Sequence, residues 1–162
     1  MRAKMKFVLM VVLLSVPAFA QNATRSGSDQ AAIVGLGQKA AVAALNFHQS
    51  DADGFTRARK DFTPDGWKNF VKSIEGFLDE KGAPTFTSSF VAARDATAVD
   101  EKEGVLHIRI PGTLTQSSNI GKTTYKAALE VYLLANRAAG GQSVKIQGLE
   151  QITCAGASTK CQ

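Results

Sequence analysis

The feature that most constrains the fold of this 162-residue chain is a change in the spacing of its apolar residues near Pro84. Before Pro84, apolar residues recur at intervals of three and four, which is the spacing of one helix face. After Pro84, apolar and polar residues alternate, which is typical of strands with one buried face. Helices followed by successive strands predict an α+β fold, with N-terminal helices packed on one face of a mostly antiparallel four-stranded sheet.

The clearest helix signal begins at Thr63, which can act as an N-cap, while Pro64 suits the first helical position. An apolar stripe follows at spacings of three and four, formed by Trp67, Phe70, Val71, Ile74, Phe77 and Leu78. We expect Trp67, Phe70 and Ile74 to contribute to the hydrophobic core.

An Ala-rich stretch over residues 30–48 predicts an earlier helix, with Ser28 or Asp29 as its N-cap. Gly35 and Gly37 lie inside it, and each glycine costs about 1 kcal/mol relative to alanine in a helix interior. They either allow another element to pack closely or delay the start of the helix.

The second half of the chain is expected to form four strands with one apolar face each. In the most regular of them, Leu106, Ile108 and Ile110 alternate with polar residues. Because no repeat or second domain interrupts it, the chain from residue 30 to residue 162 is expected to be a single domain. The strands are expected around Phe90 and over residues 105–110, 125–134 and 144–152, with turns at 49–62, 100–104, 116–121 and 138–142.

Residues 1–20 have the layout of a secretory signal peptide, with a basic head, an apolar run and small residues at Ala18 and Ala20. Cleavage is expected after Ala20. An uncleaved membrane anchor is the alternative, but it needs about 20 apolar residues and only about 14 are present. Residues 21–29 are polar and are expected to be a flexible leader. These features predict a soluble protein exported to the periplasm.

The net charge of +5 is concentrated at the N-terminus. Arg2, Lys4 and Lys6 account for three of the 19 basic residues, and the signal segment holds none of the 14 acidic residues. The mature chain is therefore nearly balanced in charge. It lacks the basic stripe that nucleic-acid binding requires, so we expect no nucleic-acid partner.

The two cysteines, Cys154 and Cys161, lie close together at the end of the chain. In an oxidising compartment such a pair is expected to form a disulfide that closes a small terminal loop. A redox-active pair is the alternative, but it usually has the C-x-x-C spacing, which is absent.

No motif in the chain has the spacing of a catalytic, metal or cofactor site. His48 and His107 have no nearby cysteine or carboxylate at ligand spacing, so each is interpreted as facing solvent or a partner. The acidic segment 51–54 lacks the ligand pattern of a calcium loop. The glycines at 35 and 37 lack the context of a dinucleotide-binding loop. We therefore expect no catalytic residue, no metal and no cofactor.

Two segments resemble the DotI/IcmL family of type IVB secretion proteins, to which the conjugation protein TraM is related. Phe62, Thr63, Pro64, Gly66 and Trp67 match the FTxxGW signature that opens a helix in this family. At the end of the chain, Gly148, Glu150 and Gln151 are similar to its closing G-I-x-Q-like strand. The resemblance covers roughly residues 30–153.

The resemblance implies a periplasmic domain whose curved sheet wraps its helices, as in cystatin-like or nuclear-transport-factor-2-like (NTF2-like) folds. It also implies assembly with other subunits of an inner-membrane translocation complex, and no catalysis. We expect periplasmic and inner-membrane secretion subunits as partners, with self-association into a homo-oligomer as the alternative. This chain departs from the family in one respect. DotI-type members carry a cytosolic tail and a membrane-spanning helix before this domain, where this chain has a short signal-like segment.

A second function remains open at this stage. An NTF2-like sheet can hold a pocket between sheet and helices, so the chain is alternatively a stand-alone periplasmic binding protein or enzyme. The inward positions of the expected strands are almost wholly apolar, whereas an enzyme pocket normally contains convergent polar groups.

Overall fold

The computed structural model describes residues 27–138 and 141–154. The expected signal peptide, residues 21–26 of the leader, and Cys161 lie outside the described residues. Residues 27–29, which were assigned to the leader, instead form the start of the first helix.

The helices come first in the chain. They are α1 (Gly27–Leu45), α2 (Ala52–Arg57), the 3-10 helix η1 (Ala58–Asp61), α3 (Pro64–Ile74) and the 3-10 helix η2 (Glu75–Phe77). Ser28 and Asp29 lie inside α1, so neither is its N-cap. The turn expected over residues 49–62 instead contains α2, whose N-cap Asp51 accepts a hydrogen bond from the backbone N–H of Gly54 at 2.7 Å.

Within the described residues the sheet contains five strands, so the expected number of four was wrong. They are β1 (Thr87–Ala92), β2 (Thr97–Lys102), β3 (Val105–Ser118), β4 (Gly121–Ala138) and β5 (Gly141–Thr153). The strand that we did not expect is β2, in which all six residues are exposed. Because it buries neither face, β2 has no alternation of apolar and polar residues from which a strand could be inferred.

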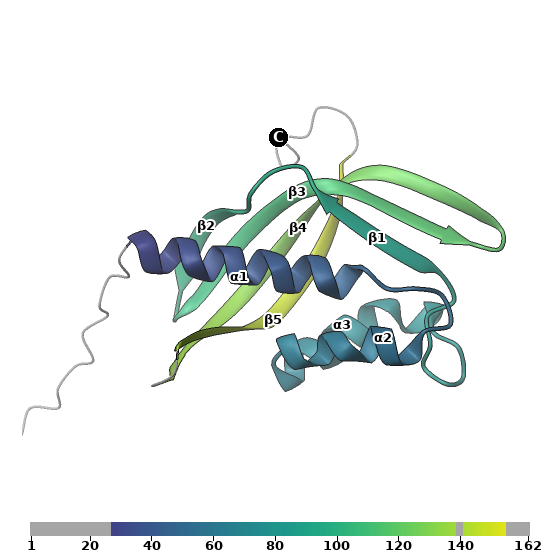
Figure 1. Ribbon diagram of the computed structural model, residues 1–162, viewed down its shortest axis with the longest axis horizontal. Helices are drawn as coiled ribbons and strands as arrows, with labels where there is room; N and C mark the ends of the chain where they lie inside the picture. The colour runs from purple at the N-terminus through teal and green to yellow at the C-terminus, as the bar shows by residue number, and fades with distance from the viewer. Residues whose placement is uncertain (1–26, 139–140, 155–162) are drawn as a thin grey trace, which may run out of the picture.

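All strand pairs are antiparallel, in the order β1-β3-β4-β5. The edge of β3 opposite β4 is shared by two short strands, because β2 pairs with the first residues of β3 and β1 pairs with its last residues. The longest pairing joins β3 to β4, and this hairpin projects well beyond the helices (Figure 1).

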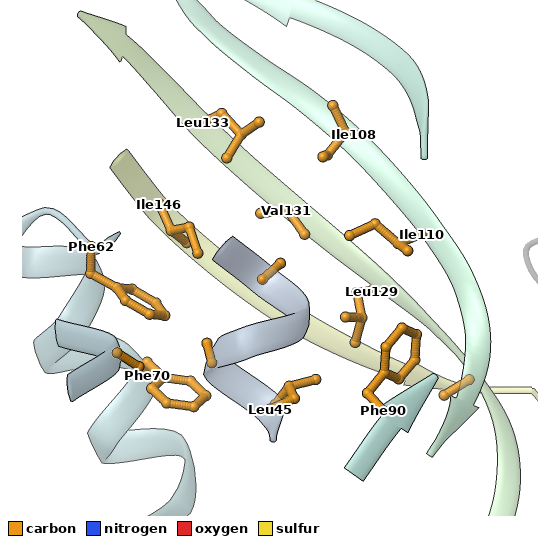
Figure 2. Close-up of a cluster of buried hydrophobic side chains, with 14 of the residues drawn as sticks. Leu45, Phe62, Phe70, Phe90, Ile108, Ile110, Leu129, Val131, Leu133 and Ile146 are labelled. Atoms are coloured by element: carbon orange, nitrogen blue, oxygen red, sulfur yellow. The ribbon is translucent and has the colours of Figure 1, made fainter. Parts of the chain in front are cut away.

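The helices cover one face of the sheet, with α1 crossing the strands and α3 packed beside β5 (Figure 1). The α+β prediction is therefore confirmed. Side chains from β3, β4 and β5 point toward the helices and form most of the core (Figure 2). The strand residues include Ile108, Ile110, Leu129, Val131, Leu133 and Ile146, and each has an exposed fraction of 0%.

Gly37 explains how α1 approaches the sheet so closely. A Cβ atom at this position would lie 2.1 Å from Cδ1 of Leu133 on β4. Gly35, in contrast, has open space where its Cβ would be. Of the two alternatives for these glycines, close packing therefore applies to Gly37 only. No helix in the described part of the chain is long and apolar enough to cross a membrane.

Candidate functional site

The segment from Phe62 to Trp67 joins α3 to strand β5. The hydroxyl of Thr63 caps α3 by accepting a hydrogen bond from the backbone N–H of Gly66 at 3.0 Å. The backbone N–H of Thr63 donates to the carbonyl of Ile146 on β5 at 2.9 Å. The residues of the FTxxGW-like segment therefore have a structural role, which is to fix the start of α3 against the sheet.

The aromatic residues around this junction pack on one another. The Trp67 ring lies 5.3 to 5.7 Å, between centroids, from the rings of Phe55, Phe62 and Phe70. Phe62 and Phe70 are buried, whereas Trp67 is half-buried at the margin of the core. Ile74 is also half-buried, and it lines a groove on the surface.

That groove is larger than two other hollows on the surface of the described residues, one beside Asn46 and one beside Gln38. It has a volume of about 740 Å³ and lies between the end of α3 with η2 and the projecting β3–β4 hairpin. Its rim exposes two apolar side chains, Phe77 at 59% and Ile120 at 93%. None of its lining residues carries a carboxylate, an amine, a guanidinium or an imidazole: Ser73, Ile74, Phe77, Thr85, Phe86, Gln116, Ser117, Ser118, Asn119, Ile120, Gly121, Thr123 and Gln151.

Beside the groove, a row of hydrogen-bonded polar side chains crosses three strands. Gln151 on β5 donates from Nε2 to the hydroxyl of Tyr125 on β4 at 2.8 Å. That hydroxyl donates to Oε1 of Gln116 on β3 at 3.3 Å. The strand register places all three side chains on the face that packs against the helices. The sequence analysis missed this row because it followed the alternation of β3 only to Ile110, whereas the same alternation reaches Gln116.

A second polar cluster lies on the opposite face of the sheet, around Glu130 of β4. The exposed fraction of Glu130 is only 4%. Its carboxylate accepts from Arg109 Nε at 2.7 Å and lies 2.5 Å from Nε2 of His107. The other ring nitrogen of His107 is 3.4 Å from a carboxylate oxygen of Asp100, on β2. The imidazole therefore bridges two carboxylates and does not face solvent. From the sequence we had expected it to face solvent or a partner.

The same cluster perturbs a tyrosine. The ring of Tyr132 stacks on that of His107, with centroids 4.6 Å apart. Burial, followed by the negative charges of Glu150, Glu130 and Asp100, raises the pKa of Tyr132 above its ordinary value of 10.0. Both ring nitrogens of His107 are engaged by carboxylates, so neither is available to a substrate while these contacts hold.

No protein-family model matches the sequence, and no curated protein matches it. Two solved structures match with TM-scores of 0.64 and 0.63: an IcmL-like type IV secretion system protein from Legionella pneumophila and the periplasmic domain of DotI. They are 12% and 16% identical to this chain, covering 83% and 82% of it and 99% of their own lengths. The chain has the DotI/IcmL fold.

The closing segment that resembles the DotI/IcmL family is divided between the two faces of the sheet. A Cβ atom at Gly148 would lie 3.1 Å from the ring of Tyr132, so this glycine makes room for the tyrosine. Glu150 pairs in register with Glu130 on the same face. Gln151 faces the groove. The three residues therefore do not form one site.

The remaining candidate residues do not converge on a site either. Cys154 follows β5 directly, and its backbone N–H donates to the carbonyl of Lys126 at 3.0 Å. Because Cys161 lies outside the described residues, the disulfide stays a prediction. Within residues 27–138 and 141–154, no group of three or more histidine, cysteine or acidic side chains is arranged to hold a metal ion.

Proposed function

We propose that this protein is a non-catalytic periplasmic interaction module that assembles with subunits of a type IVB secretion or conjugation complex at the inner membrane. The observation that carries this proposal is the open, uncharged groove on a DotI/IcmL fold, with Phe77 and Ile120 exposed at its rim. Apolar side chains gathered on an exposed concave surface are typical of binding sites. One structural neighbour is an IcmL-like type IV secretion system protein and the other is the periplasmic domain of DotI, which supports the same assignment.

The absence of catalysis is part of the proposal. The groove offers amides and hydroxyls but no lining side chain that could act as a general acid or base near neutral pH. Its chemistry suits recognition through apolar contact and neutral hydrogen bonds.

The periplasmic location rests on the sequence. The signal-like residues 1–20, cleaved after Ala20, would release a soluble chain, and a Cys154–Cys161 disulfide is suited to an oxidising compartment. We therefore propose a soluble protein that docks on the secretion apparatus, alone or as a homo-oligomer.

Cross-linking in intact cells followed by purification of the tagged full-length chain tests this function. We expect secretion-system subunits of the inner membrane to be recovered with the wild-type protein and lost with Phe77→Ser. The matched control is Val91→Ser, because Val91 is also exposed, at 65% against 59% for Phe77, but lies on β1, outside the groove. Recovery of no such subunit, or equal loss with both variants, would overturn the proposal.

A second candidate function is a stand-alone periplasmic protein that binds a small molecule. The observation that favours it is the row from Gln116 through Tyr125 to Gln151, which places oriented polar groups beside an apolar wall. Native mass spectrometry of the protein purified from periplasmic extract tests this alternative. A bound compound of one mass that is lost in the Phe77→Ser variant would favour it over the interaction module.

A further inference from the structure

Next to the groove, one edge of β4 has no partner strand among residues 27–138 and 141–154. From Gly121 to Tyr125, β4 pairs with β3 on one side only. Its pairing with β5 ends where Ala127 lies opposite Thr153, and one further hydrogen bond joins Cys154 to Lys126. No residue in the described part of the chain pairs with the second edge of 121–125, so its backbone donors and acceptors are available to another strand.

This free edge separates two surfaces of different chemistry. Gly121 and Thr123 face the groove, which has no charged lining residue. Lys122 and Lys126 alternate with them and therefore lie on the opposite face, where both are exposed. Neither lysine makes an ion pair with any described residue.

We propose that this edge binds an extended segment of a partner protein, which adds a strand beside residues 121–125 of β4. The alternate residues of the bound strand would be apolar where they enter the groove between Phe77 and Gln151, and acidic where they face Lys122 and Lys126. This inference rests on the proposed function, for which it names the docking surface and the chemistry of the docked segment.

The free edge favours a polypeptide over the other occupants. A small molecule can fill the groove, but it does not satisfy a row of backbone donors and acceptors along a strand. A second copy pairing through the same edge would bring lysines of the two copies together on one face, and neighbouring like charges destabilise a strand pair. A strand from a different protein, in which acidic and apolar residues alternate, can hydrogen-bond along the edge and also avoids the repulsion between lysines.

Binding of a synthetic probe to the purified full mature chain tests the inference without any secretion subunit. The probe is a short capped peptide in which valine and glutamate alternate. One control peptide carries lysine in place of glutamate, and the other carries N-methyl groups on alternate amides, which prevent strand pairing. We expect the probe to bind, both controls to bind about tenfold or more weakly, and amide hydrogen exchange to slow within residues 121–125. Equal binding of either control, or unchanged exchange at that edge, would overturn the inference.

Variants of the chain make the test specific. Phe77→Ser should weaken binding of the probe, and Lys122→Glu with Lys126→Glu should reverse the preference toward the lysine peptide. Val91→Ser and Lys39→Glu, which alter exposed residues elsewhere, should bind as the wild type does. Binding only after removal of residues 155–162 would assign the edge to the chain's own C-terminus, and it would also overturn the inference. Because this assay contains no secretion subunit, the inference about the docking surface and the proposed function are tested independently of each other.

Discussion

Gly66 of α3 lies so close to β5 that a Cβ atom at this position would be 2.4 Å from the carbonyl oxygen of Ile146. The obstacle is backbone that is already held by the hydrogen bond from Thr63, so it cannot rotate away as a side chain could. The glycine of the FTxxGW-like segment is therefore required by the contact between α3 and the edge of the sheet.

The first prediction is that Gly66→Ala destabilises the protein. A methyl group forced against the β5 backbone must displace either α3 or the strand, and such overpacking typically costs about 1–3 kcal/mol. Chemical denaturation followed by circular dichroism gives the free energy of unfolding directly. A variant as stable as the wild type would show that α3 can move away from β5 at little cost.

Gly35→Ala is the matched control, since it makes the same substitution in a helix where the new Cβ meets nothing within 4 Å. There the higher helix propensity of alanine should stabilise the protein, by up to about 1 kcal/mol. The two Gly→Ala variants should thus shift stability in opposite directions.

The second prediction concerns the aromatic cluster at the same junction. Phe70→Ala should lower the free energy of unfolding by about 3–5 kcal/mol, because the ring is buried with an exposed fraction of 4%. Trp67→Ala should cost less, since part of the indole is already exposed to water. Thermal melts of both variants check the order. A larger loss for Trp67→Ala would mean that the tryptophan, at the margin of the core, is its main anchor.

The alternation of apolar residues was enough to predict the α+β class and the inward faces of β3 and β4. In these strands the buried face is the one that carries the apolar side chains, so the alternation of apolar and polar residues in the sequence shows which face is buried. The same reasoning could not find β2, which is held through backbone hydrogen bonds to β3 and buries nothing.

The polar clusters were missed for a different reason. Asp100, His107 and Glu130 come from three strands, and nothing in their spacing shows that the sheet register brings them together. The groove likewise forms only when the end of α3 meets the β3–β4 hairpin. Thr63 and Pro64 were predictable as the start of a helix, because capping is local, whereas the contact of Gly66 with β5 was not.

The third prediction tests the ion pair between Arg109 and the buried carboxylate of Glu130. Arg109→Ala removes a charge-assisted donor and should cost about 1–3 kcal/mol, because the carboxylate is left partly unpaired in a buried site. In a Glu130→Gln background the same substitution should cost clearly less, since no buried charge remains to be neutralised. A double-mutant cycle by urea denaturation measures the difference. Equal costs in both backgrounds would argue that the pair does not stabilise the fold.

The fourth prediction concerns the C-terminal cysteines. If Cys154 and Cys161 form a disulfide, the protein purified from the periplasm should not react with iodoacetamide under denaturing conditions until it is reduced. Intact-protein mass spectrometry should then show two added groups, one for each cysteine. The Cys154→Ser variant is the control, because its single remaining thiol should react without reduction. Labelling of the unreduced wild-type chain would rule out the disulfide.

The last prediction is a loss of stability at alkaline pH that depends on Tyr132. Burial and the neighbouring carboxylates raise the pKa of this phenol above 10.0, so the folded protein holds the proton more tightly than the unfolded chain. The resulting stabilisation is fully present below pH 10.0 and is lost as the pH rises through the raised value. The free energy of unfolding should therefore fall more steeply above this pH in the wild type than in Tyr132→Phe. Glu150→Gln, which removes one of the charges, should shift the ionisation of Tyr132 toward lower pH. Parallel curves for the wild type and Tyr132→Phe would show that the stacked tyrosine is as free to ionise in the fold as in the unfolded chain.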